Sequence, residues 1–108
     1  MLSQLDPKTV AQRLQERPGS VVLLDVREPF ERQLATIDPS LHIPMGDIPS
    51  RLDEIPKDRE VVVYCHSGGR SMLVAGFLAE NGFSRVANLA GGIDAWSVRV
   101  DPKVPRYS

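Results

Sequence analysis

The sequence predicts a three-layer α/β/α domain in which helices cover both faces of a mostly parallel central sheet. Short, nearly continuous apolar runs occupy residues 21–26, 61–64 and 86–89. Such runs are typical of strands that are buried on both faces. Segments with helical patterns alternate with these runs, and this alternation requires crossover connections between parallel strands. We therefore expect a binding crevice beyond the carboxyl ends of the strands.

The first helix is expected to begin at Asp6. An aspartate cap is followed there by Pro7, whose missing N–H costs nothing at a helix start. Val10 and Leu14 give the helix an apolar stripe, and the Arg-Pro-Gly sequence at 17–19 ends it.

The middle of the chain contains shorter elements. Residues 29–34 can form a short helix, and residues 48–52 can form another. The His-Ile-Pro sequence at 42–44 is expected to be extended or turning, because the residue before a proline avoids the helical region.

The longest helix is predicted over residues 70–80, where the Asn-Gly pair at 81–82 ends it. Four apolar side chains of this helix are expected in the core: Met72, Leu73, Phe77 and Leu78. After the strand at 86–89, a glycine pair leads into a last short helix that Trp96 anchors in the core. Residues 101–108 are expected to form an irregular tail.

Length and composition limit the classes of function. The 108 residues suffice for one domain, 1–108, with a core from about residue 5 to 97. Thirteen basic and fourteen acidic residues leave a net charge of −1, which argues against nucleic-acid or membrane-surface binding. Neither a signal-peptide pattern nor an apolar run of ~20 residues is present. We therefore expect a cytoplasmic protein.

The cysteine and histidine content argues against an internal disulfide and against a zinc site. Cys65 is the only cysteine, so it cannot form an internal disulfide, which fits a reducing compartment. With two histidines it makes too small and too scattered a set for a zinc site. No metal is therefore expected.

Cys65 stands between an apolar strand and a glycine-rich turn, in the stretch CHSGGRS. Gly68 and Gly69 let the backbone bend so that successive N–H groups point inward. The following helix start adds its positive dipole end, and Arg70 adds a fixed charge. Such a cradle attracts an anion and lowers a thiol pKa from its usual ~8.5. Although many buried cysteines are inert, these features together predict a nucleophilic thiolate.

The spacing between Cys65 and Arg70 separates two chemistries. Phosphatases of the cysteine class use Cys-x5-Arg, whose loop wraps a tetrahedral phosphate. This chain has a Cys-x4-Arg loop, which is shorter by one residue. The smaller cradle suits a single sulfur atom carried on the cysteine.

Four segments carry a resemblance to a known family. They are VVLLDVREPFE at 21–31, HIPMGDIP at 42–49, VVVYCHSGGRS at 61–71 and NLAGGIDAW at 88–96. With these segments in this order, the sequence resembles a single-domain rhodanese, a thiosulfate sulfurtransferase-like protein, over nearly its whole length. The family usually has Gly before the His-Ile-Pro segment, where this chain has Leu41, and Gly-Ala after it, where this chain has Met45 and Gly46. These departures fall in a loop.

The resemblance implies a rhodanese-like fold and sulfur transfer without metal or organic cofactor. The Cys65 thiolate would attack the outer sulfur of a small donor such as thiosulfate and release sulfite. N–H groups of residues 66–70 would stabilise the persulfide, and cyanide or a thiol would then remove the sulfur. The implied substrate- and anion-binding loop consists of His66, Ser67, Gly68, Gly69 and Arg70.

Three further residues are candidates for supporting roles. Ser71 is expected to brace the helix start. Asp25 ends a strand on the same rim as Cys65 and is expected to fix loops there. Arg27 would either guide anions or be a solvated or ion-paired arginine. His66 would either contact the donor or be an exposed loop residue.

Two alternatives stay open at this point. The chain would also suit a sulfur-relay carrier module, in which Cys65 hands sulfur to a protein partner. A phosphatase or arsenate reductase of the same fold is a further alternative, which the short loop disfavours.

Overall fold

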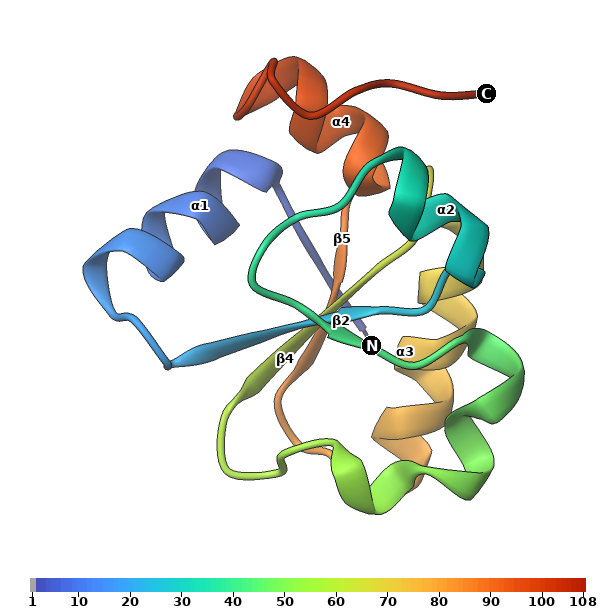
Figure 1. Ribbon diagram of the computed structural model, residues 1–108. Helices are drawn as coiled ribbons and strands as arrows, with labels where there is room; N and C mark the ends of the chain where they lie inside the picture. The colour runs from blue at the N-terminus through green and yellow to red at the C-terminus, as the bar shows by residue number, and fades with distance from the viewer. Residues whose placement is uncertain (1) are drawn as a thin grey trace.

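The computed structural model describes residues 2–108 and contains a five-stranded parallel sheet. Its strands are β1 (Ser3–Leu5), β2 (Val21–Asp25), β3 (Leu41–His42), β4 (Glu60–Tyr64) and β5 (Val86–Leu89). Their order across the sheet is β1-β5-β4-β2-β3, and every neighbouring pair is parallel. The predicted three-layer α/β class is therefore confirmed, with helices on both sides of the sheet (Figure 1).

β1 and β3 are the two edge strands; the sequence analysis did not predict β1, and at β3 it expected only an extended or turning chain from His42. They are three and two residues long and only partly buried, so they show neither an apolar run nor an alternating pattern. Their pairing partners lie far away in the chain: Ser3 pairs with Ala87, and His42 pairs with Asp25. Tertiary pairing rather than local preference therefore creates these strands.

The α-helices are α1 (Pro7–Glu16), α2 (Pro29–Leu34), α3 (Gly69–Glu80) and α4 (Gly92–Arg99). Asp6 caps α1 as predicted, because its carboxylate accepts a hydrogen bond from the N–H of Lys8 at 3.0 Å. The short helix expected over 48–52 is instead a pair of 3₁₀ helices, η1 (Met45–Ser50) and η2 (Leu52–Glu54). Pro49 lies inside η1 and has no N–H to donate, which keeps this segment from forming regular α-helix.

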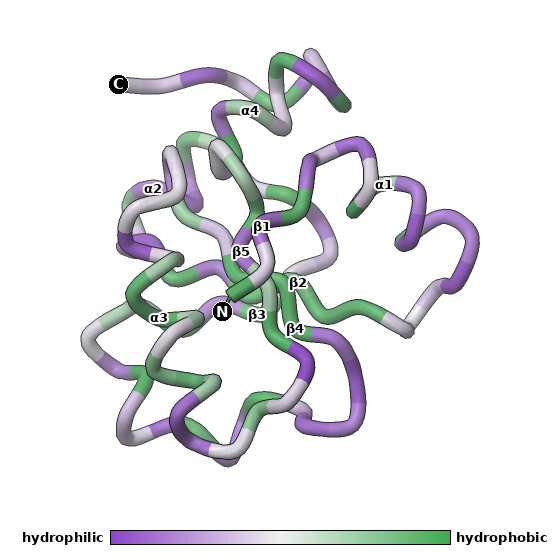
Figure 2. Tube along the Cα trace, turned by 180° about the vertical axis from the view of Figure 1, so that it is seen from behind, coloured by the Kyte–Doolittle hydropathy of each residue, from purple (hydrophilic) through white to green (hydrophobic). Residues whose placement is uncertain are grey.

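Alternation along β4 divides the core into two clusters. Val61, Val63 and Cys65 point toward the layer that contains α3, η1 and η2. Val62 and Tyr64 point toward the layer that contains α1 and α4. Figure 2 shows hydrophobic residues along β2 and β4 in the middle of the molecule and mostly hydrophilic residues along α1. Cys65 therefore lies against α3, whose first turn follows it in the chain.

Two of the core predictions for α3 are wrong. Leu73 is 66% exposed and Phe77 is 36% exposed. The buried side chains of this helix are Ser71, Val74, Ala75 and Leu78. Residues three or four positions apart share a helix face, so the stripe through Val74 and Leu78 faces the sheet and the stripe through Leu73 and Phe77 faces solvent.

Residues 101–108 contain no helix or strand, yet they pack on the domain. Val104 is buried with the cluster beneath α4, and its carbonyl accepts a hydrogen bond from Ser97 Oγ at 2.6 Å. The segment runs above α4, as the red end of the chain shows in Figure 1.

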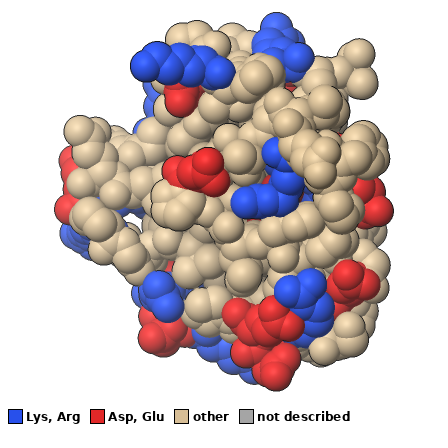
Figure 3. All heavy atoms as spheres, viewed as in Figure 1, with Lys and Arg blue, Asp and Glu red and all other residues tan. Residues whose placement is uncertain are grey.

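The surface carries charges of both signs. Figure 3 shows Lys and Arg side chains interspersed with Asp and Glu side chains across one face. Within residues 2–108, no helix is both long enough and apolar enough to cross a membrane. In the same range, no group of three or more His, Cys, Asp or Glu side chains is placed to hold a metal ion.

Candidate active site

The candidate site lies at the carboxyl end of β4, where the chain turns into α3. Cys65 directly follows β4 and is 1% exposed. Gly68 precedes α3 in the left-handed region with φ +115°. A side chain would strain this conformation, which explains why glycine stands at the turn. The turn brings the first residues of α3 back over the sulfur.

Three hydrogen-bonding groups surround the sulfur of Cys65. The backbone N–H of Gly68 lies 3.2 Å from Sγ, and that of Ser71 lies 3.4 Å from it. Ser71 Oγ is 3.3 Å from the same sulfur. The sequence analysis predicted donors from residues 66–70. The structure shows the N–H of Gly68 from that range and, in addition, the N–H of Ser71, which is the next residue.

These contacts decide the acidity of the thiol. Burial acts to raise the pKa of Cys65, whereas the Ser71 side chain, the N–H groups of Ser71 and Gly68, and the charge of Arg70 act to lower it. Burial is the largest single influence, but the four lowering influences together outweigh it, so the pKa falls below its ordinary value. Hydrogen bonds to the charged form favour that form, and the geometry therefore favours a thiolate.

Asn88 supports Ser71 from the neighbouring strand, and the sequence analysis missed it. Ser71 Oγ donates to Asn88 Oδ1. The amide of Asn88 in turn donates to Gln4 Oε1 at 3.0 Å and to the carbonyl of Gly68 at 3.3 Å. A buried asparagine within the apolar run of β5 was the available signal, because a buried amide requires partners.

The start of α4 fixes the other side of the loop. The N–H of Ile93 donates to the carbonyl of Cys65 at 2.9 Å, and that of Asp94 donates to the carbonyl of His66 at 3.1 Å. Gly92 permits this approach, because a Cβ at that position would lie 2.4 Å from the His66 carbonyl oxygen. With its carbonyls held by α4, the loop keeps the N–H of Gly68 turned toward the sulfur.

The remaining loop residues have different surroundings. His66 is half-buried, and its ring stacks on the ring of Tyr107 with centroids 4.2 Å apart. Ser67 and Gly69 are exposed. Arg70 does not point its guanidinium freely into the loop, because both of its terminal nitrogens bind Glu31.

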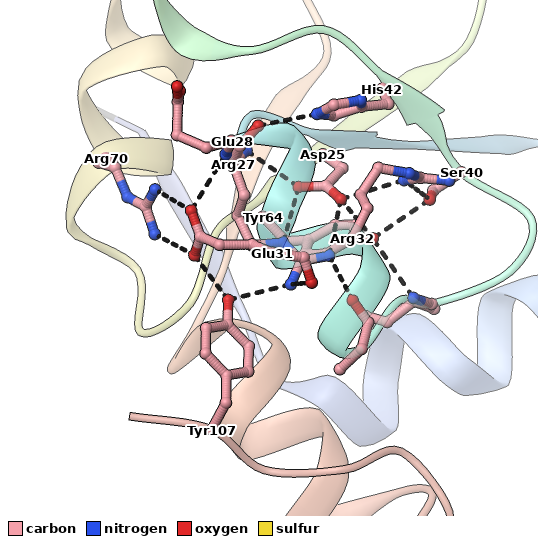
Figure 4. A network of polar contacts seen from close by, with 12 residues as sticks. Asp25, Arg27, Glu28, Glu31, Arg32, Ser40, His42, Tyr64, Arg70 and Tyr107 are labelled. Atoms are coloured by element: carbon pink, nitrogen blue, oxygen red, sulfur yellow. Dashed lines mark hydrogen bonds and ion pairs between the residues drawn. The ribbon is translucent and has the colours of Figure 1, made fainter.

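Glu31 is the second residue that the sequence analysis missed. Its carboxylate accepts from Arg70 Nη1 at 2.7 Å and from Arg70 Nη2 at 2.9 Å. These bonds from Arg70 lead the set of contacts that lowers the pKa of Glu31 to about 2. Figure 4 shows this bidentate pair at one side of a larger polar network.

Asp25 and Arg27 form a fully buried ion pair at the centre of the same network. Arg27 Nη2 donates to Asp25 Oδ2 at 2.8 Å, and Arg27 Nε donates to Asp25 Oδ1 at 2.9 Å. Burial acts to raise the pKa of Asp25, but the bonds from Arg27 outweigh it and the pKa is lowered. Since Arg27 has no exposed surface, its position favours a structural role over guiding anions. His42 Nε2 lies 2.8 Å from the Arg27 carbonyl and braces the same turn.

Tyr107 joins the two halves of this network, and no local pattern in the sequence marks it. Its hydroxyl donates to Glu31 Oε2 at 2.7 Å and accepts from Arg27 Nη1 at 3.0 Å. Figure 4 shows the Tyr107 hydroxyl between Glu31 and Arg27. Together with the stack of Tyr107 on His66, these contacts bring residues 31, 66 and 107 together.

Comparisons with known proteins agree with this geometry. The family model for the rhodanese-like domain matches residues 6–99. A sulfurtransferase of Allochromatium vinosum is 44% identical over 97 residues, which cover 90% of each chain. The YtwF protein of Bacillus subtilis is 43% identical over 88 residues, covering 82% of this chain and 84% of that protein.

A solved structure shows the same fold at lower sequence identity. A rhodanese-like domain protein of Staphylococcus aureus superposes with a TM-score of 0.84 at 28% identity. The superposition covers 99% of this chain and 100% of that one. The two proteins therefore share the fold over nearly their whole length.

Proposed function

The chain belongs to the rhodanese-like domain family, and on that premise we propose that it is a sulfurtransferase that carries a sulfane sulfur on Cys65. The observation that carries the proposal is the pair of backbone N–H groups that point at Sγ, at 3.2 and 3.4 Å, with Ser71 Oγ in contact with the same sulfur at 3.3 Å. Donors in this arrangement stabilise an anionic sulfur. They would serve the thiolate first and the persulfide afterwards.

The proposed reaction has two balanced steps. The Cys65 thiolate attacks the outer sulfur of thiosulfate, a new S–S bond forms, and the old S–S bond breaks with its electron pair leaving on sulfite. The persulfide anion then transfers its outer sulfur to cyanide, giving thiocyanate, or to a thiolate, giving a new persulfide. The Cys65 thiolate is regenerated, and no proton, redox partner or cofactor enters either step. This is covalent catalysis of the ping-pong type.

The roles we propose for the loop follow from the contacts. Gly68 and Ser71 hold the sulfur charge, and α4 holds the loop carbonyls. His66, Ser67, Gly69 and Arg70 form the rim past which a donor would enter. A small sulfur donor and a thiol or cyanide acceptor are the proposed partners, and a cytoplasmic location remains part of the proposal.

Replacing Cys65 by serine tests the function. Cys65→Ser is nearly isosteric but cannot carry a persulfide, so we expect a folded variant without thiosulfate:cyanide transfer. Mass spectrometry of the wild type after thiosulfate treatment should show one added sulfur atom, which a reductant removes. Substantial transfer by a folded Cys65→Ser protein would contradict the proposal.

The same assays separate the alternatives. A carrier that serves a protein partner would gain the sulfur atom from thiosulfate but would barely turn over with cyanide. A phosphatase would hydrolyse an aryl phosphate faster than it transfers sulfur. The loop supports sulfur chemistry, because a phosphoryl group needs room for three equatorial oxygens and the Cys-x4-Arg loop is one residue shorter than the phosphatase loop.

A further inference from the structure

The positive charge of Arg70, beside the Cys65 loop, is compensated by the negative charge of Glu31. Arg70 follows the loop and binds both oxygens of Glu31 through a bidentate pair of hydrogen bonds. The Glu31 side chain is buried, with 6% of its surface exposed. The pair thus presents a net charge close to zero to an incoming donor, and the backbone N–H groups are left as the main attraction for an anion.

Four hydrogen bonds fix the Glu31 carboxylate in its pair with Arg70. Besides the two bonds from Arg70, its carboxylate accepts from the N–H of Glu28 at 3.0 Å and from the hydroxyl of Tyr107 at 2.7 Å. Tyr107 is itself fixed, because Arg27 donates to its hydroxyl and its ring stacks on His66. Burial raises the pKa of Tyr107 to about 12, although the bond from Arg27 acts against this shift, so the hydroxyl keeps its proton and remains a donor.

The other arginines of the network do not supply a free charge at the loop. Arg27 is fully buried and paired with Asp25. Arg32 donates to Asp25 at 3.0 Å and to Ser40 Oγ at 3.0 Å. Figure 4 shows Arg32 and Arg70 at opposite sides of the network, with Asp25 and Glu31 between them.

We propose that Glu31, fixed by Tyr107, is a specificity-determining residue that makes the site prefer sulfur donors with one negative charge. Persulfides and thiosulfonates have this charge, whereas thiosulfate has two. The second charge of thiosulfate meets no uncompensated cation at the rim, and it is repelled by the Cys65 thiolate. This inference rests on the proposed sulfur transfer and narrows its donor class.

Two donors that differ by one charge test the preference. Methanethiosulfonate offers the same outer sulfur as thiosulfate but has a methyl group in place of one charged oxygen. Glu31→Gln frees the charge of Arg70, so kcat/KM for thiosulfate should rise about three- to tenfold relative to that for methanethiosulfonate, as expected for one partly screened charge. Tyr107→Phe keeps the ring on His66 and removes the hydroxyl, and it should shift the ratio in the same direction by a smaller factor.

A matched control separates a local effect from a change in net charge. Glu54 binds Arg51 through two bonds of 2.8 Å on an exposed 3₁₀ helix. Glu54→Gln therefore also frees one arginine and raises the net charge by one. It should leave the donor ratio unchanged.

A second measurement does not depend on sulfur transfer. Iodoacetate and iodoacetamide both alkylate the sulfur of Cys65 through their iodomethyl carbon. The two reagents differ by one negative charge. Glu31→Gln should raise the iodoacetate:iodoacetamide rate ratio about three- to tenfold, as for the donors. Should the wild type not transfer sulfur at all, the proposed function fails while this ratio still reports on Glu31.

The inference is overturned if neither ratio moves in Glu31→Gln by more than it moves in Glu54→Gln. Should Glu31→Gln not fold, Tyr107→Phe decides, and unchanged ratios in that variant overturn the inference equally.

Discussion

Replacing Gly92 by alanine should disturb both the fold and the Cys65 loop. Gly92 has φ +63°, and a Cβ built on it would lie 2.4 Å from the His66 carbonyl oxygen and 2.6 Å from the Cys65 carbonyl oxygen. Both neighbours are backbone atoms, so neither can rotate away. These are the same carbonyls that accept the hydrogen bonds from Ile93 and Asp94.

The magnitude follows from three contributions. A left-handed conformation costs an alanine about 1–2 kcal/mol, and weakening two buried backbone hydrogen bonds costs about 0.5–1.5 kcal/mol each. The smaller entropy of the unfolded alanine chain offsets about 0.4–1 kcal/mol. We expect Gly92→Ala to lower the free energy of unfolding by about 2–4 kcal/mol, which lowers Tm by about 10–30 °C in a domain of this size.

Thermal unfolding and alkylation of the thiol measure the two consequences. Gly46→Ala is the matched control, because a Cβ there meets no heavy atom within 4 Å and Gly46 does not have a positive φ. Where Gly92→Ala is still folded, the displaced loop should turn its N–H groups away from Sγ and raise the thiol pKa. If Gly92→Ala matches Gly46→Ala in both Tm and alkylation profile, then α4 does not hold the loop in the way described.

Two further predictions concern protons. Ser71→Ala removes a side-chain contact that lowers the thiol pKa, so the midpoint of iodoacetamide alkylation should move to higher pH. An unchanged midpoint would show that the hydroxyl does not serve the thiolate. Glu31 has its pKa lowered to about 2 in the folded protein, so its carboxylate stabilises the fold above about pH 5 and this contribution is lost as the pH falls toward about 2. Glu31→Gln should therefore be less stable than the wild type at neutral pH by about 1–3 kcal/mol, a value reduced because Arg70 is partly exposed, and denaturant unfolding should show the difference shrinking in acid; a difference that stays constant with pH would contradict this account.

The parts of the fold that the sequence predicted are those set by local patterns. The apolar runs of β2, β4 and β5 and the proline and glycine boundaries of the helices are local signals. The turn after Cys65 was placed correctly for the same reason, since glycine and a helix start mark it in the chain. Leu73 and Phe77 were misplaced because apolarity alone does not say which stripe of a helix faces the sheet.

The rest of the site depends on contacts between distant residues. Asn88 reaches Ser71 across 17 positions, and Tyr107 reaches Glu31 across 76. The partner of Arg70 also lay beyond local reasoning, because Glu31 is 39 positions away. The loop therefore revealed the nucleophile, while the residues that orient its neighbours became apparent only in three dimensions.

The spread of these contacts along the chain has a consequence for how the protein folds. Gln4 supports Asn88 across 84 positions, and β1 completes the sheet by pairing with β5. Contacts between residues far apart in the chain form slowly. The chain must lose the entropy of closing a long loop before the contact can stabilise it. Asn88, which accepts from Ser71 beside Sγ, gains its contact with Gln4 only once the N-terminal segment has docked. The support for the first turn of α3 is therefore expected to be completed late in folding.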